Sequence, residues 1–177
     1  VATAIAAVQS LAQFPVTQQQ IREGLLHTSW KGRMEQICDT LKKSPSHFLV
    51  LTAETAAGKS TVLPLALLEH FSGKIIMTEP RRIAVLGVAN RVGELTEKPK
   101  EVGYKIHLES RITCETRLEV VTEAILVRQL QSDPALEDYN VVVLDEFHER
   151  SVNTDLALAF LKEAMQLRDD LFVVIMS

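Results

Sequence analysis

Cysteine, aromatic residues and long hydrophobic runs are all scarce in this sequence of 177 residues. Its two cysteines, Cys38 and Cys114, are too few for a disulfide framework, which indicates a reducing, cytoplasmic environment. No apolar run approaches the ~18 residues that span a bilayer, so we expect no membrane segment. No basic stretch precedes an apolar core at the N-terminus, so no secretory signal is visible. A hydrophobic fraction of 46% with 24% charged residues excludes a wholly disordered or collagen-like chain.

The sequence also lacks an excess of positive charge. Its formal net charge is −4, and residues 78–128 contain nine Lys and Arg against eight Glu. Bulk charge therefore does not favour binding to nucleic acid, and any such binding must depend on a few well-placed residues.

An initiator methionine is absent as well, because the chain begins with Val1. This start predicts a fragment of a longer protein. The length fits one compact domain with a substantial core.

Two stretches of the chain differ in pattern. Residues 1–41 are typical of an amphipathic helical extension, with a break at Pro15 and a helix N-cap at Thr17. From Ser44 onward, short apolar runs alternate with helical segments, so residues 42–177 are predicted to form an α/β domain. Its sheet is expected to be mainly parallel, with helices on both faces. The predicted strands are 47–52, 74–78, 102–106, 118–122, 141–145 and 171–176, and the predicted helices are 60–71, 83–95, 123–130 and 153–167.

The first predicted strand leads into AETAAGKST, residues 53–61, and then into an apolar helix. A helix N-terminus favours bound phosphate, because it offers unpaired N–H groups and the positive end of the helix dipole. Gly58 lets the backbone approach phosphate oxygens, Lys59 can reach the β and γ phosphates, and Ser60 can place its hydroxyl on Mg²⁺. The candidate nucleotide-binding residues are Thr55, Ala56, Ala57, Gly58, Lys59, Ser60 and Thr61, of which Thr61 is a poorer candidate for the metal.

This loop departs from the usual GxxxxGK[ST] pattern, since Ala53 occupies the first position and Ala56 and Ala57 fill the middle. Alanine is strained wherever such a loop requires a positive φ. Taken alone, the segment also fits a strand–turn–helix in which a lysine merely caps a turn.

A second motif, VVVLDEFHER at residues 141–150, places two adjacent carboxylates directly after an apolar strand. Ligands of open α/β sheets bind at that edge. Asp145 is the expected Mg²⁺ contact, and Glu146, beside the metal, is the candidate to polarise the attacking water. His148 and Arg150 are placed to relay the state of the γ-phosphate. Alone, this cluster also fits a charged loop that caps a strand.

Together, the two motifs describe a nucleoside triphosphatase site. The predicted catalytic residues are Lys59, Asp145, Glu146 and His148, and the predicted metal contacts are Ser60, Asp145 and Glu146.

Five stretches, in order, resemble the first RecA-like domain of a DEAH-box helicase of the bacterial RNA-helicase type, over residues 37–177. AETAAGKST is similar to motif I, TEPRRIAV (78–85) to motif Ia, VVTEAIL (120–126) to motif Ib and DEFHER to motif II. VGYKIHLESRIT (102–113) resembles the segment that the family carries between motifs Ia and Ib. The resemblance implies a P-loop, RecA-like fold that uses ATP and Mg²⁺. It also implies hydrolysis coupled to movement on RNA or single-stranded DNA in the full-length protein.

The same resemblance implies which residues contact the sugar–phosphate backbone of a single strand. They are Pro80, Arg81 and Arg82 of motif Ia, and Thr122 and Glu123 of motif Ib. Ser177 lies where motif III begins, so the second RecA-like domain is expected to be missing. Hydrolysis in such motors needs arginines from that second domain, so turnover by this chain alone is expected to be slow or absent.

Residues 1–35 differ from the helicase pattern. ATAIAAV, FPVTQQQIREGL and WKGRME resemble a segment of folylpolyglutamate synthase near the junction of its two domains. That ligase has its phosphate loop upstream of the segment, whereas here the loop lies downstream. Two alternatives to an active helicase motor therefore stay open. One is a nucleotide- and nucleic-acid-binding module in which Ala56 impairs turnover, and the other is a fragment of a folate-polyglutamate ligase.

Overall fold

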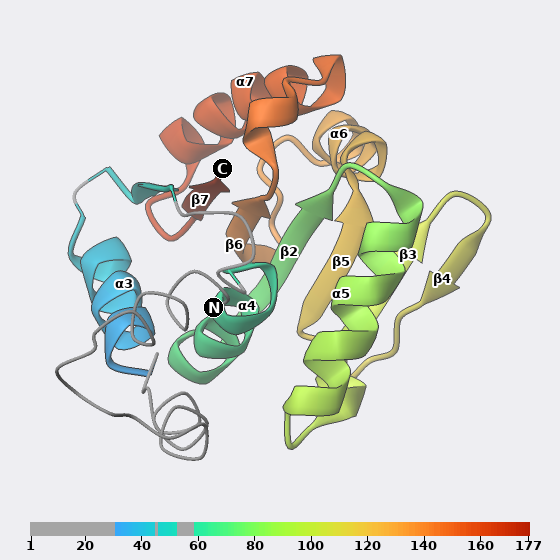
Figure 1. The fold of residues 1–177 in the computed structure, drawn as a ribbon. Coiled ribbons are helices and arrows are strands. Elements are labelled where there is room, and N and C mark those ends of the chain that lie inside the picture. Colours follow the sequence, from blue (N-terminus) through green and yellow to red (C-terminus); the bar gives the residue numbers. More distant parts are fainter. Residues whose placement is uncertain (1–30, 45, 53–58) are drawn as a thin grey trace, which may run out of the picture. The chain divides into compact units, whose positions relative to one another are not determined.

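A computed structural model describes residues 31–44, 46–52 and 59–177 of the chain (Figure 1). The chain divides into residues 1–33 and a compact unit, Met34–Ser177. The boundary predicted between residues 41 and 42 falls inside helix α3, Lys31–Lys43, in the part that belongs to the compact unit. The predicted cap at Thr17 and the helical segments around it lie outside the described residues.

The compact unit is built on a sheet with the strand order β1-β7-β6-β2-β5-β3-β4. The bounds of these strands are β1 Phe48–Leu51, β2 Lys74–Glu79, β3 Val102–Ile106, β4 Glu109–Arg111, β5 Leu118–Thr122, β6 Tyr139–Leu144 and β7 Phe172–Met176. All neighbouring strands are parallel except β3 and β4, which form an antiparallel hairpin. The prediction of a mainly parallel sheet is thus confirmed. The edge strand β4 was not predicted, because its three residues are polar and exposed and leave no apolar pattern to detect.

Helices connect the strands at the places that the apolar pattern indicates. Their bounds are α4 Lys59–His70, α5 Arg82–Leu95, α6 Glu123–Ser132 and α7 Val152–Leu167, with short 3₁₀ turns η1 Pro99–Glu101 and η2 Phe147–Glu149. Each α-helix agrees with its predicted range to within two residues at either end. Ser151 caps the start of α7, because its hydroxyl oxygen accepts a hydrogen bond from the Thr154 backbone N–H at 3.0 Å. Among the described helices, none has the length and apolar character needed to traverse a bilayer.

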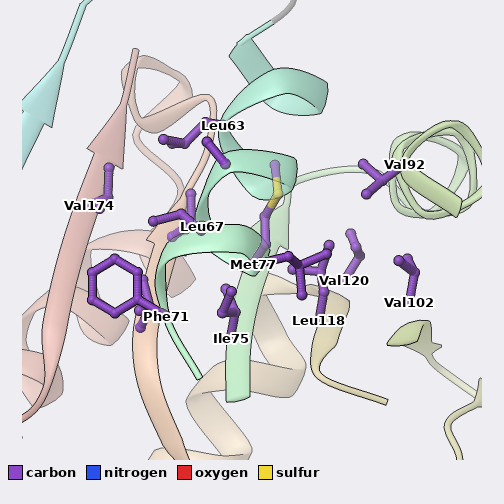
Figure 2. Close-up of a cluster of buried hydrophobic side chains, with 14 of the residues drawn as sticks. Leu63, Leu67, Phe71, Ile75, Met77, Val92, Val102, Leu118, Val120 and Val174 are labelled. Carbon is purple, nitrogen blue, oxygen red and sulfur yellow. The ribbon is translucent and has the colours of Figure 1, made fainter. Parts of the chain in front are cut away.

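The sheet has a hydrophobic core on each face. On one face, Met77 lies among side chains of α4 and α5, such as Leu67 and Val92 (Figure 2), and Val143 and residues of α3 belong to the same core. On the other face, alternate strand residues such as Val142 pack against α6 and α7. Successive side chains of a strand point to opposite faces, so strands buried on both faces are apolar at nearly every position. This is the reason that the central strands appear in the sequence as unbroken runs of Val, Ile and Leu.

The parallel strands place six chain segments along one edge of the sheet. In sheet order, the carboxyl ends belong to β1, β7, β6, β2, β5 and β3. The chain continues from β1 to α4 at Lys59, from β6 to Asp145, from β2 to Pro80 and from β5 to Glu123. Segments that are far apart in the sequence therefore meet at this edge, where ligands of open α/β sheets bind.

Candidate nucleotide and nucleic-acid site

Asp145 is the buried centre of this edge, with only 1% of its surface exposed. It follows β6, and its backbone N–H donates to the carbonyl oxygen of Thr78 on β2 at 3.3 Å. Its Oδ1 accepts a hydrogen bond from the backbone N–H of Glu146 at 2.7 Å. Its Oδ2 is buried and has no hydrogen-bond partner among the described residues. A buried carboxylate oxygen without a partner is costly, so its presence points to a ligand that completes it.

Glu79, the last residue of β2, is a second buried carboxyl group beside Asp145. It is 4% exposed, and within the described part of the chain its Oε1 also has no hydrogen-bond partner. Burial, followed by the negative charges of Asp145, Glu146 and Glu149, raises the pKa of Glu79 to about 8. Two ionised carboxylates can only accept hydrogen bonds, so the two groups can share one only while Glu79 holds a proton.

Glu146 has an unusual backbone conformation, with φ 50° and ψ 38°, in the left-handed region that glycine normally occupies. Its Oε2 lies 3.2 Å from Nε2 of His148, which is in η2. The two residues are two positions apart in the sequence, and the turn brings their side chains into contact. A strained non-glycine backbone persists only where the surrounding structure enforces it, and such residues cluster at functional sites.

Lys59 and Ser60 are the first two residues of α4, so they lie at the N-terminus of a helix that follows β1. This is the location that the phosphate-loop motif predicts for them. Thr61 occupies the next position of the same helical turn. The other predicted loop residues, Thr55, Ala56, Ala57 and Gly58, lie outside the described residues.

The motif Ia residues follow β2 at the same edge. Arg81 and Arg82 are exposed, and Pro80 is partly buried. One guanidinium nitrogen of Arg81, Nη2, donates to Oε1 of Glu149 at 3.2 Å. Arg81 thereby connects the predicted nucleic-acid segment to the end of the DEFHER motif.

The motif Ib residues follow β5, which pairs with β2 so that Thr122 lies opposite Glu79. Motifs Ia and Ib are therefore neighbours, as contacts with one nucleic-acid strand require. Thr122 is partly exposed, but Glu123 is only 7% exposed. The Glu123 carboxylate accepts hydrogen bonds from the hydroxyls of Ser151 and Thr154, the latter at 2.5 Å. Glu123 thus joins the start of α6 to the start of α7, and its predicted contact with a nucleic acid stays a prediction.

Three residues of this edge were missed by the sequence-based interpretation. Glu79 has a visible sequence signal, because it is an acidic residue at the end of the apolar run KIIMTE. Ser151 and Thr154 have the spacing of a helix cap, but nothing in the sequence places them beside Glu123.

The acidic residues fit a magnesium ion that is held jointly with a nucleotide. In the part of the chain that the structure describes, no three His, Cys, Asp or Glu side chains gather as a metal site of their own. Mg²⁺ commonly uses one or two carboxylates together with substrate phosphates and waters. The unpartnered Oδ2 of Asp145 is a hard oxygen donor of the kind that Mg²⁺ prefers.

Three features define a P-loop domain of the RecA-like class. They are a mainly parallel sheet with helices on both faces, a Lys–Ser helix start after its first strand, and a buried aspartate after β6. Residues 34–177 match the DEAD/DEAH box helicase family. The chain belongs to this family, which confirms the resemblance of its five motifs to DEAH-box helicases.

The chain is similar to the ATP-dependent RNA helicase HrpB of Escherichia coli, with 54% identity over 134 residues, 73% of this chain and 17% of that protein. A crystal structure of the E. coli DEAH/RHA helicase HrpB superposes with a TM-score of 0.77 at 47% identity. It covers 82% of this chain and 19% of the HrpB chain. A Caenorhabditis elegans protein named as a homolog of the RNA helicase DHX35 is 33% identical over 174 residues, covering 94% of this chain and 22% of its own length. The chain therefore spans only about a fifth of these relatives.

The resemblance of residues 1–35 to folylpolyglutamate synthase was wrong. The similarity to the C. elegans helicase homolog covers 94% of the chain, which is impossible without most of those residues. Short stretches of sequence rich in Ala, Gln and Leu have little specificity, so their agreement with the ligase was misleading.

Proposed function

We propose that this chain is the ATP-binding motor domain of a DEAH-type RNA helicase, and that it binds ATP with Mg²⁺ at the carboxyl edge of its sheet. The observation that carries the proposal is the buried, unpartnered Oδ2 of Asp145, at the same edge as the Lys59–Ser60 helix start and the exposed arginine pair. RNA is favoured as the nucleic acid because the relatives are named as RNA helicases.

Each side chain has a distinct task in this proposal. The N-terminus of α4 and the Lys59 ammonium group hold the phosphates, and Ser60 and Asp145 hold the metal. A Mg²⁺ ion bound there would supply positive charge that offsets the negative charge of the phosphates. Glu146 accepts a proton from the attacking water. His148 orients the Glu146 carboxylate, which lies 3.2 Å from its Nε2.

The nucleic-acid strand is proposed to lie across the ends of β2 and β5. Arg81 and Arg82 would contact its phosphates, and Thr122 would contact the same strand from the neighbouring β-strand. Because Arg81 is already paired with Glu149, a phosphate must compete with that carboxylate for the guanidinium. The binding of RNA by Arg81 is therefore coupled to the position of the DEFHER segment.

Titration of a fluorescent ATP analogue, with and without poly-RNA, tests this proposal. The wild-type chain should bind the analogue in a Mg²⁺-dependent manner, and Lys59→Ala should weaken binding at least tenfold. Lys162→Ala, which changes an exposed lysine in the C-terminal half of α7, is the matched control and should bind as the wild type does. Equal binding by the wild type and Lys59→Ala would refute the proposal. Binding without RNA-stimulated hydrolysis in the full-length protein would instead favour the non-catalytic module.

A further inference from the structure

Glu123 connects motif Ib with the segment that follows the DEFHER motif. It comes directly after Thr122, which is proposed to contact the RNA strand, and it is 7% exposed. Its Oε1 accepts a hydrogen bond from the Thr154 hydroxyl at 2.5 Å, and its Oε2 accepts one from the Ser151 hydroxyl. Ser151 in turn comes directly after Arg150, the last residue of DEFHER. One buried carboxylate is therefore bonded to both segments.

A tight turn continues this connection from Ser151 to Glu146. The 3₁₀ turn η2 lies between Glu146 and Arg150, two residues in the left-handed region, each with φ 50°. The backbone N–H of Glu149 donates to the carbonyl oxygen of Glu146 at 2.9 Å. That of Arg150 donates to the carbonyl oxygen of Phe147 at 3.2 Å. Because the turn is short and internally hydrogen-bonded, a displacement of Ser151 also displaces Glu146, the proposed proton acceptor.

Motif Ia contacts the same turn, but by a weaker bond. Nη2 of Arg81 donates to Oε1 of Glu149 at 3.2 Å, and these side chains are 76% and 34% exposed. Water and salt weaken an exposed ion pair of this kind. The bonds to Glu123 are shielded from water, since Thr154 is only 2% exposed. The contact through Glu123 is therefore the stronger of the two connections.

The Thr154 hydroxyl is not needed to build α7. Ser151 caps the helix, because its hydroxyl oxygen accepts a hydrogen bond from the Thr154 backbone N–H at 3.0 Å. The Thr154 hydroxyl instead donates to Glu123, at the start of α6. It therefore serves the contact between α6 and α7, which cover the same face of the sheet (Figure 1).

We propose that Thr154 is a positioning residue of the hydrolysis reaction, which through Glu123 connects RNA bound at motif Ib to the placement of Glu146. The inference rests on the proposed function of the same edge. When RNA contacts Thr122, the adjoining carboxylate shifts with it, and its bonded hydroxyls shift the DEFHER turn. Substitutions in such hydrogen-bond networks change the coupling between two sites by about 2- to 30-fold. RNA affinity need not change, because reciprocity between sites holds for binding and not for kcat.

Thr154→Val is the decisive variant, because it keeps the shape of the side chain and removes the hydroxyl. In the full-length protein, we compare kcat for ATP hydrolysis with saturating poly-RNA to kcat without RNA. This ratio should fall by about threefold or more. RNA affinity, from fluorescence anisotropy, and kcat without RNA should stay within twofold of the wild type. Thr154→Ser retains the hydroxyl and should keep the ratio within twofold of the wild type.

Thr116→Val is the matched control, because Thr116 is also a threonine that is 2% exposed. Its Oγ1 accepts a hydrogen bond from the backbone N–H of Thr113 at 2.9 Å. It precedes β5 and so lies at the opposite end of that strand from Thr122. This variant should lower the melting temperature and leave the ratio unaltered.

The outcomes separate the two levels of inference. If RNA does not stimulate hydrolysis by the wild-type full-length protein, the proposed motor function fails and this inference fails with it. If RNA stimulates the wild type and the ratio for Thr154→Val falls less than threefold, only the role of Thr154 is refuted. An unfolded Thr154→Val protein, or equal losses of kcat with and without RNA, would also overturn it, because both results describe a structural residue.

Discussion

Replacing Glu123 with alanine removes a buried carboxylate on which two helix starts depend. Its oxygens accept hydrogen bonds from the hydroxyls of Ser151 and Thr154, which begin α7, while Glu123 itself begins α6. The family resemblance predicts that Glu123 contacts nucleic acid, whereas its burial indicates that it holds two helices together. The substitution separates these two roles.

The expected loss of stability follows from the hydrogen bonds that break and those that survive. A hydrogen bond to a charged group contributes about 1.5–3 kcal/mol. Ser151 and Thr154 retain partners in each other, since their hydroxyl oxygens lie 2.8 Å apart and Ser151 still caps the Thr154 N–H. We therefore expect Glu123→Ala to lower the free energy of unfolding by about 2–3 kcal/mol rather than by the full sum of two bonds. Glu123→Gln, which keeps one acceptor oxygen, should lower it by about 1 kcal/mol.

Urea unfolding followed by circular dichroism measures this loss, and a melting temperature lower by about 5–10 °C should accompany it for Glu123→Ala. Glu163→Ala, an exposed glutamate on α7, is the control and should change stability by less than about 0.5 kcal/mol. RNA affinity of Glu123→Gln, from fluorescence anisotropy at a temperature where it is folded, should remain within twofold of the wild type. A Glu123→Ala protein with wild-type stability and weakened RNA binding would refute this reasoning.

Two further predictions concern the cysteines and the glycines. At pH 8, iodoacetamide should modify the exposed Cys114 quickly and Cys38 only after unfolding in urea. Cys38 is fully buried, and burial raises its pKa to about 11, so its reactive thiolate is scarce. Equal rates of modification of the two cysteines, measured by mass spectrometry, would contradict this. Gly103→Ala should lower the free energy of unfolding by about 1–3 kcal/mol, because a Cβ there would lie 2.5 Å from the carbonyl oxygen of Arg111. Gly87→Ala, in α5 with nothing within 4 Å of the new Cβ, should raise the free energy of unfolding by about 0.5–1 kcal/mol. Thermal melts that show Gly103→Ala to be more stable than Gly87→Ala would contradict both predictions.

The candidate site could be predicted only in part. The motifs placed Asp145, Glu146 and Lys59 at strand ends and a helix start, because the geometry of a strand–turn–helix is local. The contact between His148 and Glu146 also lies within one turn, but the sequence did not predict it. The role of Glu123 could not be judged in the same way, since its burial depends on Ser151 and Thr154, which lie about thirty residues further along the chain.

The α/β class and nearly all of the strands and helices could be read from the sequence alone, because a strand buried on both faces must be apolar along its whole length. It failed at β4, whose exposed polar residues carry no such pattern. Which strand ends meet is known only from the folded structure. β2 lies between β6 and β5, and this order puts Glu79 beside Asp145, 66 positions away in the sequence, and motif Ia beside motif Ib. Strand order follows from how the helices pack on both faces of the whole sheet, a property that no short segment of sequence contains.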